Sequence, residues 1–466
     1  MSGPPTSARA GREDLSGRRY AVVGAGVSGL AAAWNLQKRG AETHIFEREQ
    51  ALGGRAGSGL LGDRMLTLGG KNIGRSYRRF REFTAALGDH PYEYFGINSS
   101  RVIGGRMVTF DSEHRLGMLG NLRGISARDL ARLGRLAMTL RRDPQARYLD
   151  EESCRALSHR YRFASIGDAF SERLQELLLR SLTVRVSAAE PDEVPMANVL
   201  PYLGMLTDTY DQLAGGMDDV LKAAAQRSTL HLGSTVRGLL RDERGVYGVR
   251  LSPITGQGRP GGGDFDDGGS AEPRFDGVIL ATPAQTTARL LAQDAPRTAA
   301  LLAEVRYFPL LVLLAEYERP VFEHRVRAIV FGPEHELSNA GAYGTDELNV
   351  VRYTFSGRSA RALSEQEPDA ERLAAIAEAT LGPHAPIAGN RRRALLAKRF
   401  LPGLCAYHPD QAGLLSHLES GGEAIPGLSL AGDYLRGCSI EGCFAAAQEA
   451  VAAIVSAAPA GRLLPA

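Results

Sequence analysis

The spacing of apolar and polar positions is most regular near the N-terminus, where it predicts a strand, a helix and a second strand. An apolar run at Tyr20–Val23 is followed by small and apolar residues at helical spacing as far as Leu36, and then by a strand-like stretch that ends at Glu47. A turn containing three glycines separates the first strand from the helix. A strand, a tight turn, a helix and a second strand make a βαβ unit, so the sequence predicts an α/β fold with a Rossmann-like domain.

The three glycines have the G-x-G-x-x-G spacing that binds dinucleotides when a strand and a helix flank it. Gly24 allows the tight turn, Gly26 lets the backbone approach a pyrophosphate, and Gly29 lets helix and strand pack closely. The N–H groups and the positive dipole at the helix start favour an anion. Glu47 stands where a carboxylate can accept hydrogen bonds from a ribose diol. The binding residues predicted in this unit are Gly24, Ala25, Gly26, Val27, Ser28, Gly29, Glu47 and Arg48.

Two more glycine-rich turns follow. In Leu52-Gly53-Gly54-Arg55 the glycines let the backbone come close to a pyrophosphate, which the guanidinium of Arg55 can bind bidentately. The other turn is Leu68-Gly69-Gly70-Lys71-Asn72. Both turns come directly after the dinucleotide unit, and we therefore expect the first of them to contact the same ligand.

The end of the chain repeats the pattern of strand, turn and helix. An apolar strand from Leu428 leads to Gly432 and Asp433, and a helix of small residues starts near Ile440. The carboxylate of Asp433 can bind hydroxyl groups, and the N–H groups at the helix start can stabilise negative charge. The sequence thus predicts two helix starts, far apart in the chain, that hold opposite ends of one ligand.

In this order the motifs resemble those of the FAD-dependent amine oxidase, protoporphyrinogen oxidase and carotenoid desaturase superfamily. The N-terminal glycine motif, the turn at Leu52–Arg55 and the C-terminal Ala431-Gly432-Asp433 turn with its helix start carry the resemblance. It implies a GR2-type flavoprotein in which a Rossmann-like FAD-binding domain is interleaved with an α+β substrate domain. The further FAD-binding residues that it implies are Gly53, Gly54, Arg55, Gly69, Gly70, Lys71, Val236, Ala281, Thr282, Gly432, Asp433, Ser439, Ile440 and Glu441.

The resemblance also points to candidate catalytic residues. In the superfamily the segment at Gly69–Asn72 passes close to the flavin ring, and Lys71 and Asn72 depart from the commoner residues there. Lys71 can stabilise negative charge on the reduced ring, or act as a base once burial lowers its pKa; pairing with a phosphate or carboxylate is the alternative. Tyr407 and His408 can line the substrate face of the flavin, or can be a packed aromatic residue and a loop histidine. Cys405 is a candidate for covalent attachment, although its surroundings resemble the non-covalent branch.

The pattern and the resemblance divide the chain into alternating segments. The expected domains are a disordered N-terminus at 1–17, an FAD-binding domain at 18–75, 206–300 and 401–466, and a substrate domain at 76–205 and 301–400. The first substrate segment has a mostly helical pattern. Residues 253–274 are rich in glycine, aspartate and proline and are expected to form a flexible hairpin tip.

One helix of the substrate domain has a basic face. In the segment from Ala127 to Arg142 the predicted apolar stripe is Leu130, Leu133, Ala137 and Leu140, with arginines opposite. Such a helix is usually a surface helix with a solvated arginine face, but it can also lie on an anionic membrane. Peripheral membrane contact therefore stays open.

Composition narrows the classes of function. The chain has 466 residues and a formal charge of +2, which gives no reason to expect a nucleic acid partner. Its four cysteines are widely spread and fit no metal site or disulfide framework. The N-terminus has no apolar signal segment, and no apolar run is long enough to span a bilayer. We expect a cytoplasmic protein.

The resemblance implies an FAD-dependent oxidoreductase that removes hydride from a C–N or C–C bond of a small, hydrophobic organic substrate. Oxygen or another electron acceptor would then reoxidise it. The stretch Phe308–Leu314 has no lysine where monoamine and polyamine oxidases commonly place one, which favours the protoporphyrinogen oxidase or desaturase branch. The alternative is a carotenoid or isoprenoid desaturase or isomerase. A redox-neutral flavoenzyme, a flavin-binding subunit without turnover and the oligomeric state stay open.

Overall fold

The computed structural model describes residues 13–96, 98–103, 106–111, 124–161, 164–252 and 274–456. The expectations of disorder at 1–12 and of a flexible tip at 253–273 lie outside the described residues. The expectation of disorder is wrong for residues 13–17. Leu15 is fully buried in the core of the first domain, and its backbone N–H donates to the carbonyl of Arg39 at 2.7 Å.

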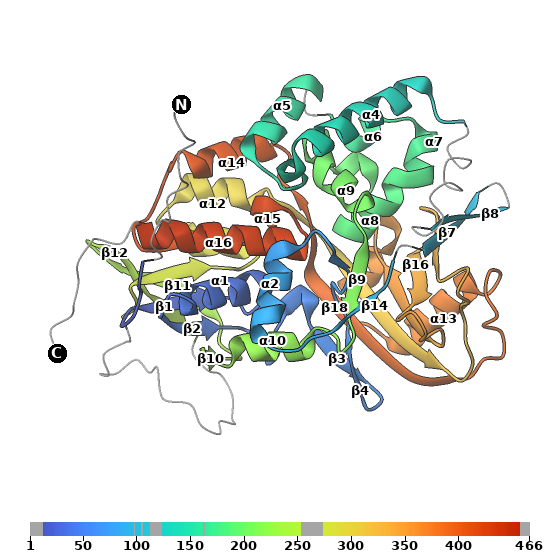
Figure 1. Cartoon of the computed structure of the whole chain (residues 1–466), viewed down its shortest axis with the longest axis horizontal. Helices are drawn as coiled ribbons and strands as arrows, with labels where there is room; N and C mark the ends of the chain where they lie inside the picture. Colours follow the sequence, from blue (N-terminus) through green and yellow to red (C-terminus); the bar gives the residue numbers. More distant parts are fainter. Residues whose placement is uncertain are drawn as a thin grey trace, which may run out of the picture.

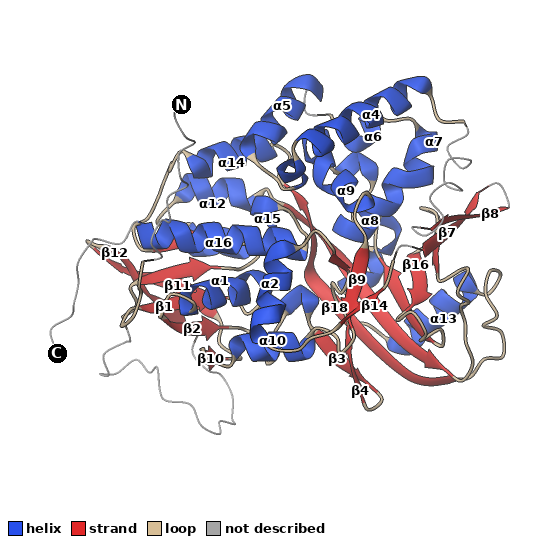
Figure 2. Cartoon of the chain, viewed as in Figure 1, coloured by secondary structure: helices blue, strands red, loops and turns tan. Residues whose placement is uncertain are grey.

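A parallel sheet forms the centre of the first domain (Figures 1 and 2). Its order is β10-β2-β1-β13-β19, and every neighbouring pair is parallel. Three distant parts of the chain supply it: β1 (Arg19–Val23) and β2 (Glu42–Phe46), β10 (Thr229–His231) and β13 (Gly277–Leu280), and β19 (Leu428–Leu430). Of these strands, β1, β2 and β19 are the ones predicted above from apolar patterning, and the predicted α/β Rossmann-like fold is confirmed.

Helices and a hairpin cover the two faces of this sheet. One core cluster joins the sheet to α1 (Val27–Gln37), α2 (Arg78–Leu87), α10 (Asp218–Ala225) and α16 (Ile440–Ser456). A second cluster joins the other face to the hairpin of β11 (Val236–Asp242) and β12 (Gly245–Leu251), and to α11 (Ala284–Leu291), α12 (Pro296–Ala303) and α14 (Gln411–Glu419). Because α1 and α16 pack on the same face, their N-terminal ends are brought to the same side of the sheet (Figure 1).

The second domain contains a mixed sheet in the order β18-β14-β17-β16-β15-β7-β8. The strands are β7 (Asn98–Ile103), β8 (Arg106–Asp111), β14 (Arg306–Tyr317), β15 (Ala328–Val330), β16 (Leu337–Ala342), β17 (Val350–Phe355) and β18 (Arg392–Tyr407), and α13 (Ala370–Leu381) packs on the sheet. The stretch Arg306–Tyr317 is one continuous strand of 12 residues. It pairs with β17 and β18, which bury it on both sides.

Helices form the rest of the second domain, at the upper right of Figure 1. They are α4 (Ala127–Arg142), α5 (Glu151–Tyr161), α6 (Ile166–Ala169), α7 (Glu172–Leu174), α8 (Arg180–Ser187) and α9 (Val199–Leu206). The segment at 76–205 is thus mostly helical, as its pattern predicts, but it also contributes β7 and β8 to the mixed sheet and β6 (Tyr92–Tyr94) to a smaller one.

Short strands lie at the junction of the two domains and position the site. They are the hairpin of β3 (Ser58–Leu61) and β4 (Arg64–Thr67), and the small sheet in which β9 (Tyr210–Leu213) pairs with β5 (Ile73–Gly74) and β6. The short helix α15 (Asp433–Arg436) precedes α16. These elements carry the glycine turns at 53–55, 69–70 and 215–216 to one place.

The predicted buried stripe of α4 is partly wrong. Leu136 and Leu140 are buried, whereas Leu130 is 44% exposed and Met138 is 46% exposed. The helix is turned because its buried Asp129 accepts a hydrogen bond from the Ser171 hydroxyl at 2.5 Å, which brings the Asp129 side onto the domain. Within the described part of the chain, none of the helices combines the length and the apolarity needed to cross a bilayer.

Candidate functional site

The first glycine turn has tight packing at two positions and open space at the third. Gly24 has a φ of +103°, and a Cβ atom there would lie 2.7 Å from the carbonyl oxygen of Ala281. A Cβ atom on Gly29 would lie 1.8 Å from the oxygen of Gly24, whereas one on Gly26 would meet no atom within 4 Å. Gly24 and Gly29 are therefore required by the turn itself. The open space at Gly26 is where a ligand can approach the backbone.

The start of α1 leaves its amides available to a ligand. Gly26 is the N-cap residue and supplies no side-chain cap, and it has an extended backbone. The second glycine turn packs directly against it, since Gly53 N–H donates to Ala25 O at 2.8 Å and a Cβ atom on Gly54 would lie 3.4 Å from Gly26 Cα. The three glycines 26, 53 and 54 thus form one surface around the helix start.

Glu47 closes the outer end of this surface. One carboxylate oxygen accepts the Ala25 N–H at 2.7 Å and the other accepts the Glu49 N–H at 3.0 Å. The Ser234 N–H donates to Glu47 O at 2.8 Å, and this contact brings the start of β11, at Val236, to the same end. Arg48 is exposed and donates to the carbonyl of Leu401 at 3.4 Å.

Arg55 lies in a network with Asp433 and Tyr307. Its Nη1 donates to Asp433 Oδ2 at 2.5 Å, and the Tyr307 hydroxyl donates to Asp433 Oδ1 at 3.0 Å. Burial alone would disfavour the guanidinium charge, but the adjacent carboxylate of Asp433 holds the pKa of Arg55 above its usual value. Arg55, expected at a pyrophosphate, and Asp433, expected at ligand hydroxyls, are therefore paired with each other across 378 positions of sequence.

The third glycine turn meets the start of α16. A Cβ atom on Gly69 would lie 1.9 Å from Arg55 O, so the two turns are in backbone contact. Gly70 is exposed, and its only neighbour within 4 Å of a Cβ position is the Ile440 side chain at 3.9 Å. The Ser439 hydroxyl accepts the Gly442 N–H at 2.9 Å and caps the helix. A side chain at position 70 would thus be in ordinary van der Waals contact with Ile440, so the third glycine turn lies beside the start of α16.

Glu441 serves a structural purpose through its side chain. The carboxylate is fully buried and accepts the N–H groups of Arg79 at 3.0 Å and Phe80 at 3.1 Å, so it caps α2. Arg79 Nη1 also pairs with it at 3.3 Å. Only the backbone N–H of Glu441 remains for a ligand. Ala281 and Thr282 lie against Gly24, at the other helix start.

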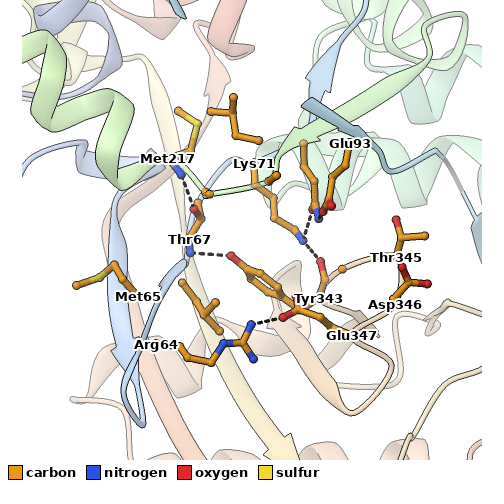
Figure 3. Close-up of a pocket in the computed structure, with 17 residues that line it drawn as sticks. Arg64, Met65, Thr67, Lys71, Glu93, Met217, Tyr343, Thr345, Asp346 and Glu347 are labelled. Atoms are coloured by element: carbon orange, nitrogen blue, oxygen red, sulfur yellow. Dashed lines mark hydrogen bonds and ion pairs between the residues drawn. The ribbon is translucent and has the colours of Figure 1, made fainter. Parts of the chain in front are cut away.

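Lys71 projects into a cavity of about 310 Å³ (Figure 3). The ammonium group donates to Gln212 Oε1 at 2.9 Å and to the carbonyl of Tyr343, and it lies 3.9 Å from the centre of the Tyr343 ring. Burial lowers the pKa of Lys71 well below its usual value; Arg352 lowers it further, and Glu347 and Glu93 oppose the shift. With two N–H bonds donated, the third position of the nitrogen is left for a proton or a lone pair.

Hydrogen bonds and an ion pair join the residues that line this cavity. The Tyr343 hydroxyl accepts the Thr67 N–H at 2.8 Å, and Thr67 Oγ1 accepts the Met217 N–H at 3.0 Å, which ties the glycine turn at 215–216 to β4 (Figure 3). Arg64 and Glu347 form an ion pair at its edge. Asn72, next to Lys71, is partly exposed and makes no side-chain hydrogen bond to a described residue.

Tyr407 and His408 do not line this cavity. Tyr407 is fully buried with a φ of +69°, and its hydroxyl accepts the Cys438 N–H at 3.0 Å, just before α16. His408 accepts the Asp410 N–H at 2.8 Å through Nδ1 and lies 3.3 Å from Glu304 through Nε2. Tyr407 thus supports the α16 start, and His408 ties β18 to α12.

Cys405 is fully buried beside Tyr307. Burial, together with Asp433, raises the pKa of its thiol well above the usual value, so the nucleophilic thiolate is not formed. No group of metal-ligating side chains is found among the residues whose placement is described. The structure therefore does not favour covalent attachment at Cys405.

Sequence reasoning missed several side chains that the structure brings to the site. Tyr307 lies in an apolar run and Gln212 in a short strand, so neither stands out by pattern. Tyr343, Arg185 and Arg352 come from other segments. One sequence feature could have marked two of them: an arginine within an otherwise apolar or β-branched stretch, which indicates a charged residue placed in the interior. Examples are Leu182-Thr-Val-Arg185-Val and Val350-Val-Arg352-Tyr.

The parallel sheet, the glycine turns and the two helix starts define a protein with a Rossmann-like α/β domain and an inserted second domain. Residues 27–455 match the model of the family described as flavin containing amine oxidoreductase. The chain belongs to this family and is a flavin-dependent oxidoreductase.

Comparison with known proteins finds relatives over nearly the whole length. The chain is 24% identical over 94% of its length to coproporphyrinogen III oxidase of Mycobacterium leprae, covering 99% of that protein. A stretch of 43 residues, 9% of this chain and 8% of the relative, is 56% identical to protoporphyrinogen oxidase 2 of Arabidopsis thaliana. The fold is similar to that of cyclohexylamine oxidase from Brevibacterium oxydans, with a TM-score of 0.69 and 18% identity over 94% of this chain and 99% of that one.

Proposed function

We propose that the flavin is FAD and that it spans the two helix starts. The residues around Gly26 would hold the pyrophosphate, Glu47 and the start of β11 the adenosine end, and Gly70 with the start of α16 the ring. Two observations support this assignment: the space beside Gly26 that no protein atom fills, and the uncapped start of α1. The third glycine turn, at Gly70, lies beside the Ile440 side chain at the start of α16. Arg55 contacts the same turns through Gly69 and Gly70.

The proposed reaction is the oxidation of a C–N or C–C bond of an organic substrate. When bound, FAD accepts a hydride equivalent from the substrate carbon and passes the two electrons to oxygen or another acceptor. The second domain would orient the substrate and exclude water. Lys71 would hold or take up the proton that leaves the substrate, because its lowered pKa makes the neutral amine accessible and its two hydrogen bonds fix its position.

The relatives name two kinds of substrate for such a site. One group is named for coproporphyrinogen III and protoporphyrinogen, and the other for cyclohexylamine and putrescine. We favour a porphyrinogen-like C–H and N–H oxidation over amine oxidation. The relatives named for coproporphyrinogen III align with nearly the full length of this chain, and the β14 stretch Phe308–Leu314 lacks a lysine.

The observation that carries the proposal is the meeting of two helix starts, at Gly26 and Ile440, around glycine turns that leave space. The test is to purify the protein, release its cofactor and identify it by chromatography, and then to mix the holoprotein anaerobically with coproporphyrinogen III, protoporphyrinogen, cyclohexylamine and putrescine. We expect one FAD per chain and bleaching of the flavin by a porphyrinogen.

Two outcomes would contradict the proposal in different ways. A protein that stays colourless after incubation with excess FAD would exclude the cofactor assignment. A protein that binds FAD but is bleached only by the amines would keep the cofactor and overturn the preferred substrate. A Lys71→Met variant separates binding from chemistry, because it should retain FAD and lose reduction rate.

A further inference from the structure

The side-chain nitrogen of Lys71 lies against two aromatic rings. Nζ is 3.9 Å from the centre of the Tyr343 ring and 4.5 Å from the centre of the Phe95 ring. A cation within about 6 Å of a ring centre is attracted by the negative face of the ring, and the attraction is largest where water is excluded. Tyr343 is buried and Phe95 is half-buried. Both rings therefore stabilise a charge on Lys71 that burial disfavours.

The two rings differ in how they lie relative to the cavity around Lys71. Tyr343 lines this cavity of about 310 Å³ together with Lys71 (Figure 3), whereas Phe95 is not one of its lining residues. A substrate in the cavity could therefore contact Lys71 and Tyr343 without touching Phe95. Because Phe95 reaches the nitrogen from outside the cavity, it can act on a reaction there only through Lys71.

The backbone of Phe95 is held in place by three other parts of the chain. Phe95 directly follows β6, and its N–H donates to the carbonyl of Tyr210 in β9 at 3.1 Å. Its own carbonyl accepts a hydrogen bond from the guanidinium of Arg327. One residue earlier, the carbonyl of Tyr94 accepts the Thr345 hydroxyl at 2.9 Å. The ring of Phe95 is thus presented to Lys71 from a fixed backbone position.

The hydrogen bonds of Lys71 go to neutral oxygens. Gln212 Oε1 accepts one at 2.9 Å, and the carbonyl of Tyr343 accepts the other. The Gln212 amide in turn donates to the carboxylate of Glu93, its partner across the β6–β9 ladder, so the amide is fixed with its oxygen towards Lys71. Neither acceptor carries a charge that could balance an ammonium ion, which leaves the two rings as the groups in direct contact that favour one.

Charged groups surround Lys71 at longer range. Burial lowers its pKa most, and Arg352 and Arg327 lower it further, whereas Glu347 and Glu93 raise it. These charges come from four different segments and have both signs, so they partly cancel. The other charged residues that line the cavity are Arg64, which pairs with Glu347, and Asp346.

We propose that the rings of Phe95 and Tyr343 take the place of water around the ammonium group, and that Phe95 thereby sets the pH range in which Lys71 accepts a proton. This inference rests on the proposed function and adds a positioning residue to it. When the substrate gives up its proton, the lone pair of Nζ forms the new N–H bond, and the electrons of the broken bond stay with the substrate. The positive charge that appears on Nζ then lies over two rings.

The test is an NMR titration of the lysine side chains. The chain has only four lysines, at positions 38, 71, 222 and 398, so lysine labelled with carbon-13 at Cε gives a simple spectrum in which Lys71→Met identifies the Lys71 signal. In the cofactor-free protein we expect Phe95→Leu to lower the Lys71 midpoint by about one pH unit, the size of one ring contact in a dry site. Phe95→Tyr keeps the ring and should keep the parent midpoint.

A matched control removes a ring elsewhere. Tyr161 in α5 is also half-buried and its ring also lies against a cation, with Arg132 Cζ 5.4 Å from the ring centre. Tyr161→Leu should therefore leave the Lys71 midpoint unchanged. If Phe95→Leu does not fold, Phe95→Met removes the ring with a different apolar side chain and has the same expected shift. In the FAD-loaded protein, the pH at which anaerobic flavin reduction reaches half of its plateau should fall with the midpoint.

The outcomes are separable from those of the proposed function. The NMR midpoint needs neither FAD nor turnover, whereas cofactor content and flavin reduction in the parent protein test the function itself. An unchanged or raised Lys71 midpoint in Phe95→Leu, or an equal fall in Phe95→Tyr, would overturn the inference even in an active flavoenzyme. A lowered midpoint with an unaltered pH profile of flavin reduction would also overturn it, because Lys71 would then not receive the proton.

Discussion

The two domains treat positive charge in opposite ways. At the edge of the nucleotide domain, Arg55 is matched by Asp433 and Arg79 by Glu441, each within one buried or half-buried pair. In the second domain, Arg185 forms no ion pair with a described residue, and burial and then its charge lower the pKa of Arg101 and Arg352. Both regions surround the same proposed ligand site.

The contrast separates charges that are paired within the fold from one that is not. Removing one partner of a buried ion pair costs much folding free energy, because the other charge stays buried alone. Removing a charge that has no partner breaks no such pair, so the folded state loses no stabilisation. The pairs at the glycine turns thus position the backbone, whereas Arg185 has no such structural pairing among the described residues. The experiments below test that division.

The largest effect is expected where the nucleotide domain leaves space. In Gly26→Val the extended backbone accepts a β-branched residue, but the side chain occupies the approach to the helix start. Losing two charge-assisted backbone hydrogen bonds would cost about 4 kcal/mol of FAD binding, roughly a thousandfold in Kd. The flavin absorbance of the purified protein and its Kd for FAD measure this. Gly134→Ala is the control, because a Cβ atom there also meets nothing but lies on the far surface of α4. Retention of bound FAD by Gly26→Val would contradict the cofactor site.

Breaking a matched charge pair is the second test. Arg55→Met leaves the carboxylate of Asp433 buried without its partner, which we expect to cost about 3 kcal/mol of unfolding free energy. Adding Asp433→Asn removes the stranded charge and should recover part of that loss. Urea denaturation at saturating FAD compares the three proteins. If the double variant is no more stable than Arg55→Met, the pair is not what holds these turns together.

Lys71 lies between charged groups of both signs. Burial and then Arg352 lower its pKa, and Glu347 and Glu93 raise it. We expect Lys71→Met to lower the rate of anaerobic flavin reduction about a hundredfold with FAD content unchanged. Because its pKa is lowered, Lys71 loses its proton at a lower pH than an ordinary lysine does. The parent rate should therefore rise with pH and reach a plateau, and the variant should lose this limb in stopped-flow traces. An unaltered pH profile would remove Lys71 from the chemistry.

The smallest effect concerns His231, whose ring lies beside that of His44 in the nucleotide domain. Burial and then His44 lower the pKa of His231 to about 4, and its ring stacks on Phe46 at 4.4 Å. The unfolded chain takes up the proton near pH 6.5, so stability is lost as the pH falls from there towards 4. His231→Phe keeps a stacked ring without the proton, and it should reduce this loss by about 1 kcal/mol, or about 1–2 °C in Tm. Melting curves at pH 7.5 and 4.5 measure it, and an equal acid-induced drop in both proteins would contradict the assignment.

Local patterning was sufficient to predict the nucleotide domain. Its strands are short apolar runs, Gly29 is required by its contact with the oxygen of Gly24, and Gly24 has a φ of +103° that favours glycine. Failures came where distant contacts decide the outcome. Leu15 is ordered because a core from other segments receives it, and α4 is rotated by the bond between Asp129 and Ser171. Neither contact has a signal in the nearby sequence.

The residues of the candidate site also differ in whether local sequence could predict them. Residues that bind through backbone, such as Gly26 and Gly70, could be predicted because glycine itself marks a close approach. The partners of side chains could not. Arg55 was expected at a phosphate and is paired with Asp433, and whether Arg185 has a counter-ion depends on elements more than a hundred positions away.

Two long strands have a consequence for how substrate enters. β14 and β18 run for 12 and 16 residues from the nucleotide domain, where the Tyr307 hydroxyl bonds Asp433, to the far end of the second domain, where the Tyr317 hydroxyl bonds Glu378 of α13. They are paired along most of that length, with register shifts towards both ends, and both domains share them. A movement of one domain against the other would have to bend this pair of strands, so we expect ligand exchange to depend on side chains and loops.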